Sequence, residues 1–405
     1  MKHTIKPTLF GYGLTTKAIA EKLGGGCLFF DDNTQETFTD ENKNIIKPSS
    51  LFNPNESSLE VTTPSLNPNH PLIKNAKNLQ SEYDYFAEIM PFSIWISGTN
   101  GKTTTTQMLT HLLEKRGAVS GGNIGTPLAK LDENAPMWVL ESSSYTLHHT
   151  YKASPNIYIL LPITPDHLDW HGTAEAYEAD KLRPLLTMKE GELALVPKGL
   201  TLPKTDAYIV EYDTNEEIAT YFNLDSSKLH FKAAFLQDAL LALAVSKVLF
   251  DEADYTLMNQ FKKDAHRQEE LKDTLGRIWV NDSKATNLDA TIQAIQAYAD
   301  KPIHLILGGD DKGVDMEDLF KRIQTLNITL YTIGSNNQKL LALANQYHIN
   351  AVESLTLSQA VKQIHHVLTL EDIALLSPAA SSLDQFKSYK ERGELFIQWI
   401  KALKK

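Results

Sequence analysis

Residues 92–106 read FSIWISGTNGKTTTT, and this stretch decides the fold of the chain around it. The run FSIWI is apolar and β-prone, and it ends in the polar, glycine-containing loop SGTNGKT (97–103). A helical pattern follows through Leu113. Strand, glycine loop and helix in this order form a phosphate cradle, because loop N–H groups and the positive end of the helix face an anion. The stretch therefore predicts an α/β domain with a nucleoside triphosphate site.

Two side chains complete this cradle. Lys102 offers a point charge to phosphate oxygens, and Thr103 offers a hydroxyl oxygen to Mg²⁺. The usual G-x-x-x-x-G-K-[ST] pattern is broken at its first position, where Ile96 stands. A plain strand-to-helix turn with a surface lysine is the alternative, but the order of the elements favours the phosphate site. The ATP-binding residues predicted from the loop are Gly98, Thr99, Asn100, Gly101, Lys102, Thr103 and Thr104.

Size and composition limit the class of protein. A chain of 405 residues is long for one core and predicts two or three domains. The net charge of −11 argues against a nucleic-acid partner, and the single cysteine, Cys27, excludes an internal disulfide and a thiolate metal cluster. The N-terminus lacks the apolar run of a signal peptide, and no segment has the length of a membrane span. We therefore expect a cytoplasmic enzyme without membrane insertion.

The region before the loop also has an α/β pattern. Residues 8–31 predict strand, turn, helix and strand, with Gly11-Tyr12-Gly13 at the turn. A lone Gly-x-Gly fits either a turn in a small α/β domain or a site for nucleotide phosphates. Residues 33–81 are polar and rich in Asn and Pro, which predicts loops. A domain boundary is expected near residues 80–92.

Apolar runs and helical patterns alternate through the rest of the chain. Central strands are expected at 138–140, 157–161, 193–196 and 207–210, and helices at 173–183 and 233–250. From residue 276 on, strands at 277–280, 303–307, 328–333 and 373–376 alternate with helices at 289–299, 336–346, 356–368 and 384–402. Such alternation predicts βαβ units and a parallel sheet.

Several residues of the central region can do chemistry. Glu141 follows the apolar run WVL and is either a Mg²⁺ ligand or a solvated acid at a strand end. The loop PDHLDWH (165–171) gathers two carboxylates and two imidazoles, which favours a site over a plain polar turn. Lys181 shares a helix face with Tyr177, four residues earlier, and on position alone is a surface lysine.

Three polar loops follow strands of the last region. They are NDSKATN (281–287), GGDDKG (308–313) and SPAASS (377–382). Each alone is as easily an ordinary loop as a site. Because the carboxyl ends of parallel strands meet at one edge of a sheet, the three together predict a lined cleft.

The motifs together resemble the Mur ligases, the ATP-dependent amide-forming enzymes of peptidoglycan precursor synthesis. SGTNGKTTTT, GGNIGTP (121–127) and the acid after the second central strand carry the resemblance to the whole family. WVNDSKATNLDAT (279–291), LGGDDKG (307–313) and SPAASSLDQFKSYKERGELF (377–396) are similar to the branch that adds D-glutamate. The resemblance spans nearly the whole chain.

The resemblance implies an architecture of three α/β domains. A small N-terminal Rossmann-like domain (1–85) would bind the UDP substrate, a central P-loop ATPase domain (86–275) would bind ATP, and a C-terminal Rossmann-like domain (276–405) would bind the amino acid. It also implies that ATP phosphorylates the carboxylate of UDP-N-acetylmuramoyl-L-alanine and that D-glutamate attacks the acyl phosphate. Mg²⁺ at two sites, with Mn²⁺ as a substitute, and a monomeric state are expected.

The resemblance also assigns roles to individual residues. Lys102, Glu141, His167 and Lys181 would be catalytic, with Lys181 carbamylated, and the metal ligands would be Thr103, Glu141, His167 and Lys181. Further ATP contacts would be Arg267, Asp282 and Asp238. The UDP substrate would contact Leu14, Thr15, Thr16, Asp31, Asn123 and His167. D-Glutamate would contact Lys284, Thr286, Lys312, Ser382, Leu383 and Tyr389.

The sequence departs from the family pattern in three places. Phe235 and Asp238 stand where two adenine-contacting asparagines are usual, Thr63-Pro64-Ser65 replaces Ser-Pro-Gly, and Thr146 replaces a glutamine. Two alternatives stay open. One is another Mur-type ligase, such as a folylpolyglutamate synthase or a diamino-acid-adding enzyme. The other is a nucleotide-dependent switch or motor whose last domain binds a protein.

Overall fold

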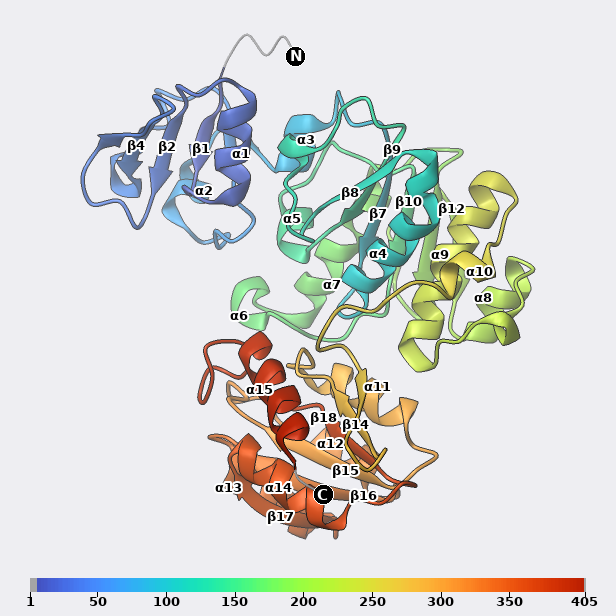
Figure 1. Ribbon diagram of the computed structural model, residues 1–405. Helices are drawn as coiled ribbons and strands as arrows, with labels where there is room; N and C mark the ends of the chain where they lie inside the picture. Colours follow the sequence, from blue (N-terminus) through green and yellow to red (C-terminus); the bar gives the residue numbers. More distant parts are fainter. Residues whose placement is uncertain (1–5, 404–405) are drawn as a thin grey trace. The chain divides into compact units, whose positions relative to one another are not determined.

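The computed structural model describes residues 6–403 and contains three six-stranded α/β sheets (Figure 1). The chain forms two compact units. One comprises Met1–Phe231 and Phe235–Phe261 and holds the first two sheets, and the other comprises Lys232–Ala234 and Lys262–Lys405 and holds the third. The predicted fold class, three α/β sheets in one chain, is confirmed. The extreme ends of the predicted first and third domains, residues 1–5 and 404–405, lie outside the described residues.

The first sheet has the strand order β3-β4-β2-β1-β5-β6. Its elements are β1 (Thr8–Phe10), α1 (Leu14–Lys22), β2 (Leu28–Asp31), β3 (Phe38–Thr39), β4 (Ile45–Pro48), β5 (Glu60–Thr62), α2 (Pro71–Asn75) and β6 (Leu79–Gln80). The predicted β1, α1 and β2 are present. The segment 33–81, predicted as loops, also contributes four strands, because strands of two to four residues leave no apolar run long enough to recognise.

The central sheet has the order β12-β11-β10-β7-β9-β8, and all its paired strands are parallel. Its strands are β7 (Phe92–Ser97), β8 (Ala118–Gly122), β9 (Met137–Glu141), β10 (Ile157–Leu160), β11 (Leu193–Pro197) and β12 (Tyr208–Tyr212). Its helices are α3 (Glu82–Phe86), α4 (Lys102–Leu113), α5 (Ser144–His148), α6 (Leu168–His171), α7 (Ala174–Leu182), α8 (Asn215–Tyr221), α9 (Ala233–Phe250) and α10 (Tyr255–Met258).

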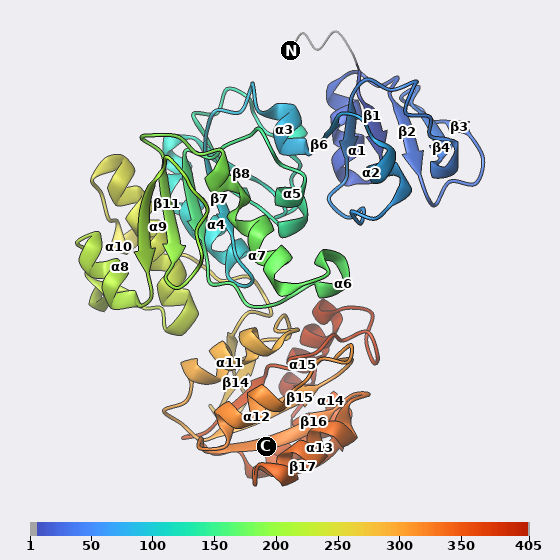
Figure 2. The same ribbon diagram turned by 180° about the vertical axis from the view of Figure 1, so that it is seen from behind.

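Strand β7 is buried on both faces, which explains why its sequence is apolar almost throughout. Ile94 and Ile96 pack into the core that α4 and α9 cover, and Trp95 packs into the opposite core with residues of α3, α5 and α7. The two layers of helices lie on opposite faces of the sheet (Figure 2). The phosphate-loop strand therefore stands at the centre of the domain, with its carboxyl end open to the loops.

The third sheet has the order β13-β14-β18-β15-β16-β17. Its strands are β13 (Glu269–Lys272), β14 (Ile278–Asn281), β15 (Ile303–Gly308), β16 (Ile328–Ile333), β17 (Asn350–Leu355) and β18 (Ile373–Leu376). Its helices are α11 (Leu288–Ala297), α12 (Glu317–Ile323), α13 (Asn337–Gln346), α14 (Leu357–Val367) and α15 (Tyr389–Ala402). β13 is antiparallel to β14, and the other pairs are parallel.

The third sheet also corrects the sequence prediction. The helix expected at 384–402 begins only at Tyr389, because Ser388 is extended and its side chain caps the first turn. Strands β13 and β17 and helix α12 were not predicted. β13 and β17 are edge strands with mixed polar residues, so they lack the apolar run of a buried strand.

Helix α9 is long and apolar enough to cross a membrane by length and composition alone, so the expectation that no segment has the length of a membrane span is wrong. Ten of its residues from Phe235 to Ser246 are buried, and its leucines and alanines belong to the central core. The helix is thus the packed core helix of an α/β layer. Within residues 6–403 it is the one helix that passes this test.

The glycine loop after β15 offers a test of backbone constraint. Gly309 has φ of +146° and a Cβ there would lie 2.3 Å from the carbonyl oxygen of Ser381, whereas Gly313 has φ of +78° in open space. We expect Gly309→Ala to lower the free energy of unfolding of the third sheet by more than 3 kcal/mol and Gly313→Ala by about 1 kcal/mol. Urea unfolding of both variants measures the difference, and equal losses would contradict the packing at Gly309.

Candidate active site

The phosphate loop is shaped by two glycines between β7 and α4. Gly98 has φ of +140°, and Gly101, which precedes the first residue of α4, has φ of +83°. A Cβ at Gly98 would lie 2.5 Å from Leu161 Cβ, and a Cβ at Gly101 would lie 2.8 Å from Asp238 Oδ1. Both positions need glycine for backbone conformation and for close packing. The predicted order of strand, loop and helix is confirmed.

The structure explains why isoleucine stands at the first position of the G-x-x-x-x-G-K-[ST] pattern. Ile96 is fully buried in β7, where it pairs with Ile159 of β10 and Glu141 of β9. The loop begins only after Ser97, the last residue of β7. A glycine at position 96 would therefore serve no turn and would remove a side chain from the core.

Lys102 and Thr99 hold the loop together. The Lys102 ammonium donates to the carbonyl oxygens of Gly98 (2.9 Å) and Thr99 (2.8 Å). The Thr99 hydroxyl donates to the Thr164 carbonyl (2.9 Å) and lies 3.1 Å from the Tyr177 hydroxyl. The positive charge of Lys102 thus stays over the loop. The remaining predicted loop residues, Asn100, Thr103 and Thr104, continue into the first turn of α4.

Glu141 ends β9 next to this loop and is 3 % exposed. Its Oε1 accepts a hydrogen bond of 2.6 Å from the Asn123 amide. Its Oε2 is buried and has no hydrogen-bond partner among the described residues. A buried carboxylate oxygen without a donor is costly unless a cation meets it. The oxygen donors here fit Mg²⁺, which prefers carboxylate and hydroxyl ligands.

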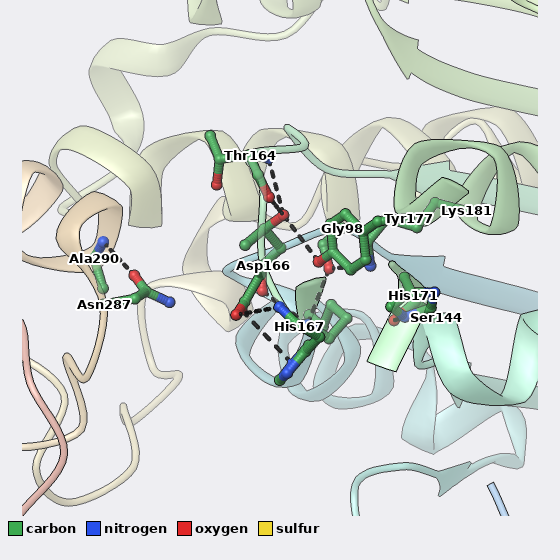
Figure 3. A network of polar contacts seen from close by, with 12 residues as sticks. Gly98, Ser144, Thr164, Asp166, His167, His171, Tyr177, Lys181, Asn287 and Ala290 are labelled. Carbon is green, nitrogen blue, oxygen red and sulfur yellow. Dashed lines mark hydrogen bonds and ion pairs between the residues drawn. The ribbon is translucent and has the colours of Figure 1, made fainter. Parts of the chain in front are cut away.

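Lys181 lies in α7 and is 1 % exposed, so it is not the surface lysine that its position alone suggests. Its Nζ donates to the Gly98 carbonyl (2.7 Å) and lies 4.6 Å from the centre of the Tyr177 ring, as Figure 3 shows. Burial lowers the pKa of this amine well below its usual range, and the charge of Lys102 lowers it further. Both effects favour the neutral amine of Lys181, which is the nucleophilic form.

His167 stands at the start of α6 with a left-handed backbone, φ +54°. Its side chain is 45 % exposed, and Nε2 lies 3.6 Å from the Asp166 carboxylate. Partial burial lowers the pKa of the imidazole, although the Asp166 charge opposes this. The ring centre lies 6.4 Å from that of Tyr177 (Figure 3). The exposed imidazole thus lies near Tyr177 and is free to contact a ligand.

A second polar network lies behind Lys181 and escaped the sequence analysis. Asp180 Oδ2 accepts hydrogen bonds from His148 Nδ1 (2.8 Å) and His171 Nδ1 (2.9 Å), and Oδ1 accepts from Arg183 (2.7 Å). His171 Nε2 also lies 3.0 Å from the Ser144 hydroxyl. These donors hold the pKa of Asp180 below its usual range against the effect of burial. The network fixes the turn of α7 that carries Lys181.

Asp238, for which an ATP contact is predicted, lies against the phosphate loop. It is buried in α9, and its Oδ1 accepts a hydrogen bond of 3.0 Å from the Thr105 hydroxyl. The same oxygen faces the backbone of Gly101. Asp238 therefore supports the phosphate loop and the first turn of α4 through these contacts.

Four predicted contacts of the UDP substrate lie at the carboxyl ends of β1 and β2. Asp31 accepts backbone hydrogen bonds from Tyr12 (2.8 Å) and Asn33 (2.9 Å). Thr16 is buried, and its hydroxyl donates to the Gly11 carbonyl (2.6 Å). Asp31 and Thr16 therefore shape the Gly-Tyr-Gly turn, whereas Leu14 is 62 % exposed and Thr15 is half-buried. Asn123 and His167 lie in the central domain instead.

The other compact unit carries the remaining ATP contacts and the amino-acid residues. Asp282 follows β14 and accepts hydrogen bonds from Ser377 Oγ (2.8 Å) and the Gln268 N–H (3.2 Å). Burial raises its pKa to about 7, while the charge of Arg267 opposes the rise. Arg267 Nε is itself buried without a hydrogen-bond partner among the described residues. The Nε–H of Arg267 can thus donate to a further acceptor.

The three loops predicted to share a sheet edge do meet. Asp310 and Ser381 form an antiparallel bridge, and the Ala379 N–H donates to the Ala285 carbonyl (3.1 Å). The Lys284 ammonium lies 5.7 Å from the centre of the Tyr389 ring. The other predicted amino-acid contacts divide by exposure: Ser382 is buried, and Thr286, Lys312 and Leu383 are exposed.

Comparison with known proteins gives the family. Residues 96–240 match the model of the Mur ligase middle domain. The chain is 50 % identical over 402 residues to the UDP-N-acetylmuramoylalanine–D-glutamate ligase of Campylobacter jejuni, covering 98 % of this chain and 100 % of that one. The chain belongs to the Mur ligases. The Helicobacter pylori Mur ligase of the same name is 45 % identical over 419 residues, covering 98 % and 99 %.

Solved Mur ligase structures support the same fold. The MurF ligase of Thermotoga maritima in complex with ADP has a TM-score of 0.60 at 13 % identity, covering 99 % of this chain and 98 % of that one. MurC from the same organism has a TM-score of 0.56 at 14 % identity, covering 97 % and 98 %. At such low identity the likeness establishes a common Mur ligase fold and no more.

A signal for the Asp180 network was present in the sequence. The loop 165–171 shows its histidines in the sequence. The carboxylate that His171 contacts, Asp180, lies nine residues further along, on α7, and the other histidine partner of Asp180, His148, lies on α5. Helical spacing alone pairs Asp180 with Arg183, three residues later. The contact between α5 and α7 that brings His148 to the carboxylate is tertiary.

The buried Asp180 carboxylate gives a stability prediction. Asp180→Asn removes the charge that three donors share, and we expect it to lower the free energy of unfolding by about 3 kcal/mol. The exposed Asp169, on α6, is the control, and Asp169→Asn should change it by less than about 0.5 kcal/mol. Chemical denaturation measures the free energy of unfolding of both variants. Similar losses would contradict the stabilising role of the Asp180 network.

Proposed function

We propose that the protein is an ATP-dependent ligase of peptidoglycan precursor synthesis that adds D-glutamate to UDP-N-acetylmuramoyl-L-alanine and forms ADP. The observation that carries this proposal is the convergence at the central sheet. A glycine loop with Lys102 lies beside the buried amine of Lys181 and beside Glu141, whose Oε2 has no donor within residues 6–403. Such a site holds phosphates together with cations. The full-length similarity to ligases of that name supports the substrates.

The chemistry follows from the poor reactivity of a carboxylate. An oxygen of the alanine carboxylate attacks the γ-phosphorus of ATP, the bond to ADP breaks, and an acyl phosphate results. The neutral amine of D-glutamate then attacks the acyl carbon, the resulting tetrahedral species expels phosphate, and the nitrogen loses a proton. Two anions must approach each other in the first step, so positive charge from Lys102 at the loop lowers the barrier.

Metal ions would be held by residues around the loop. Thr103, Glu141, His167 and Lys181 are the proposed ligands of two Mg²⁺ sites, at which Mn²⁺ would substitute. Bound Mg²⁺ supplies charge neutralisation for the phosphate oxygens. The Asn123 amide fixes the Glu141 carboxylate so that its second oxygen points away from that bond.

Lys181 fits this ligand set only as a carbamate. A lysine amine is nucleophilic towards CO₂ when it is neutral, and burial favours the neutral form here. Addition of the nitrogen to CO₂ with loss of a proton gives a carbamate, which turns a cation into an anionic oxygen ligand. We therefore propose that Lys181 is carbamylated.

Each of the three sheets belongs to a region that we propose binds one substrate. We propose that residues 1–85 bind the UDP substrate, 86–275 bind ATP and 276–405 bind D-glutamate. The compact units divide near Phe261 and Lys262, and β13 already belongs to the third sheet. A monomer in the cytoplasm, without nucleic acid or membrane insertion, remains our prediction.

The reaction is tested by phosphate release from ATP. We expect release only when UDP-N-acetylmuramoyl-L-alanine and D-glutamate are both present, and little release with L-glutamate or meso-diaminopimelate. Release with one of these other amino acids would indicate a different Mur-type ligase. Release without any amino acid would favour a nucleotide-dependent switch and overturn the proposal.

Two variants test the assigned catalytic roles. Lys102→Ala and His167→Ala should each lower kcat/KM for ligation by about 100-fold or more, because each removes a group from the site of charge development. Lys115→Ala, an exposed lysine beyond the end of α4, is the control and should keep full activity. Substantial turnover in either site variant would contradict the role given to that residue.

Carbamylation of Lys181 has a direct readout. Protein equilibrated with ¹³C-bicarbonate should give a carbamate carbon resonance that Lys181→Arg lacks, because arginine cannot form the adduct. The mass of the intact protein under native conditions gives a second measurement. A plain amine at Lys181 in fully active protein would show the carbamate proposal to be wrong.

A further inference from the structure

A buried arginine lies at the base of the loops of the third sheet. Arg392 belongs to the first turn of α15 and is 1 % exposed. Its Nε donates to Ser283 Oγ (3.0 Å) and its Nη2 to the Ser283 carbonyl (2.8 Å). Nη1 and Nη2 also donate to the Ala380 carbonyl, both at 3.2 Å. One guanidinium thus joins the loop after β14, the loop after β18 and helix α15.

The acceptors of this guanidinium are all neutral. No ion pair within residues 6–403 involves Arg392, whereas the other buried arginine of this unit, Arg277, pairs with Asp273 at 2.7 Å. Burial lowers the pKa of Arg392 to about 10, partly offset by the charge of Asp384, so it stays protonated at neutral pH. Burying a cation that is not paired with a carboxylate costs folding free energy.

The loops that Arg392 joins carry the residues proposed to bind the amino acid. Lys284 and Thr286 follow Ser283, and Ser382 follows Ala380 by two positions. The Ser283 hydroxyl, which accepts from Arg392, itself donates to the Tyr389 carbonyl (2.8 Å). Lys284 is therefore the next residue after Ser283, and Tyr389 is joined to Ser283 by one hydrogen bond. No residue of this network needs to touch the ligand.

We propose that Arg392 is a positioning residue for the acidic amino acid: it fixes the loops after β14 and β18 against α15 and so holds in place the residues that these loops offer to the ligand. This inference rests on the proposed function of the third sheet. The planar, five-donor fork of arginine reaches both carbonyl oxygens and the serine hydroxyl at once. A lysine carries the same charge but cannot span both loops.

The test is steady-state kinetics of Arg392→Lys with each substrate varied in turn. We expect the KM for D-glutamate to rise about tenfold or more, because loops released from the fork misplace the binding groups. The KM for ATP should stay within about twofold, since the phosphate loop belongs to the central sheet. Ser283→Ala, which removes one acceptor and the link to Tyr389, should raise the KM for D-glutamate in the same direction by less.

Arg277→Lys is the matched control. Arg277 is also buried and also donates to two carbonyl oxygens, those of His365 and Leu368, but it precedes β14 at the amino edge of the sheet. It should lower the melting temperature without raising the KM for D-glutamate.

Three results would decide the matter. If Arg392→Lys keeps the wild-type KM for D-glutamate, or if Arg277→Lys raises that KM equally, the positioning role is wrong. If Arg392→Lys does not fold, Ser283→Ala decides by the same criterion. If the wild-type protein does not use D-glutamate at all, the proposed function fails first, and this outcome is distinguishable because it appears without any substitution.

Discussion

The central site depends on a close backbone approach that only glycine permits. At Gly98 a Cβ would lie 2.5 Å from the Cβ of Leu161, the residue after β10, so the loop can approach this residue only without a side chain. This approach exposes the Gly98 carbonyl to two lysines, Lys102 at 2.9 Å and Lys181 at 2.7 Å. One carbonyl oxygen thus links the phosphate cradle to the buried amine. The two positive charges disfavour each other, and the buried amine yields its proton more readily.

Buried carboxylates in the same domain divide into two kinds by their partners. Asp180 is surrounded by three donors on two oxygens, and it holds α5, α6 and α7 together. Glu141 has one oxygen bonded to Asn123 and the other without a partner among the described residues. The first carboxylate is satisfied by the protein itself. The second would be satisfied by a cation, and this is the physical argument for our proposal that Glu141 is a metal ligand, whereas Asp180 gives structural support.

Much of the fold was predictable because its elements are strongly periodic and locally consistent. The strand β7, the helices α7 and α9 and the strands β10 and β18 lie close to their predicted ranges. The short strands β3 to β6 and the edge strand β17 were missed, since they are too short or too polar to leave a pattern. The three loops of the third sheet were expected at one edge, and the bridge between Asp310 and Ser381 joins two of them.

The sequence by itself determined the phosphate loop, the order of strands and helices, and the set of polar segments that follow strands, because these depend on neighbours along the chain. Only the tertiary structure decided which charges are buried. Lys181 has the spacing of a surface lysine, yet it lies 1 % exposed against Gly98, 83 residues away. Arg392 lies in the first turn of α15, yet its acceptors are Ser283, 109 residues away, and Ala380. Burial and long-range partners set the charge state of a side chain, and neither is written in local sequence.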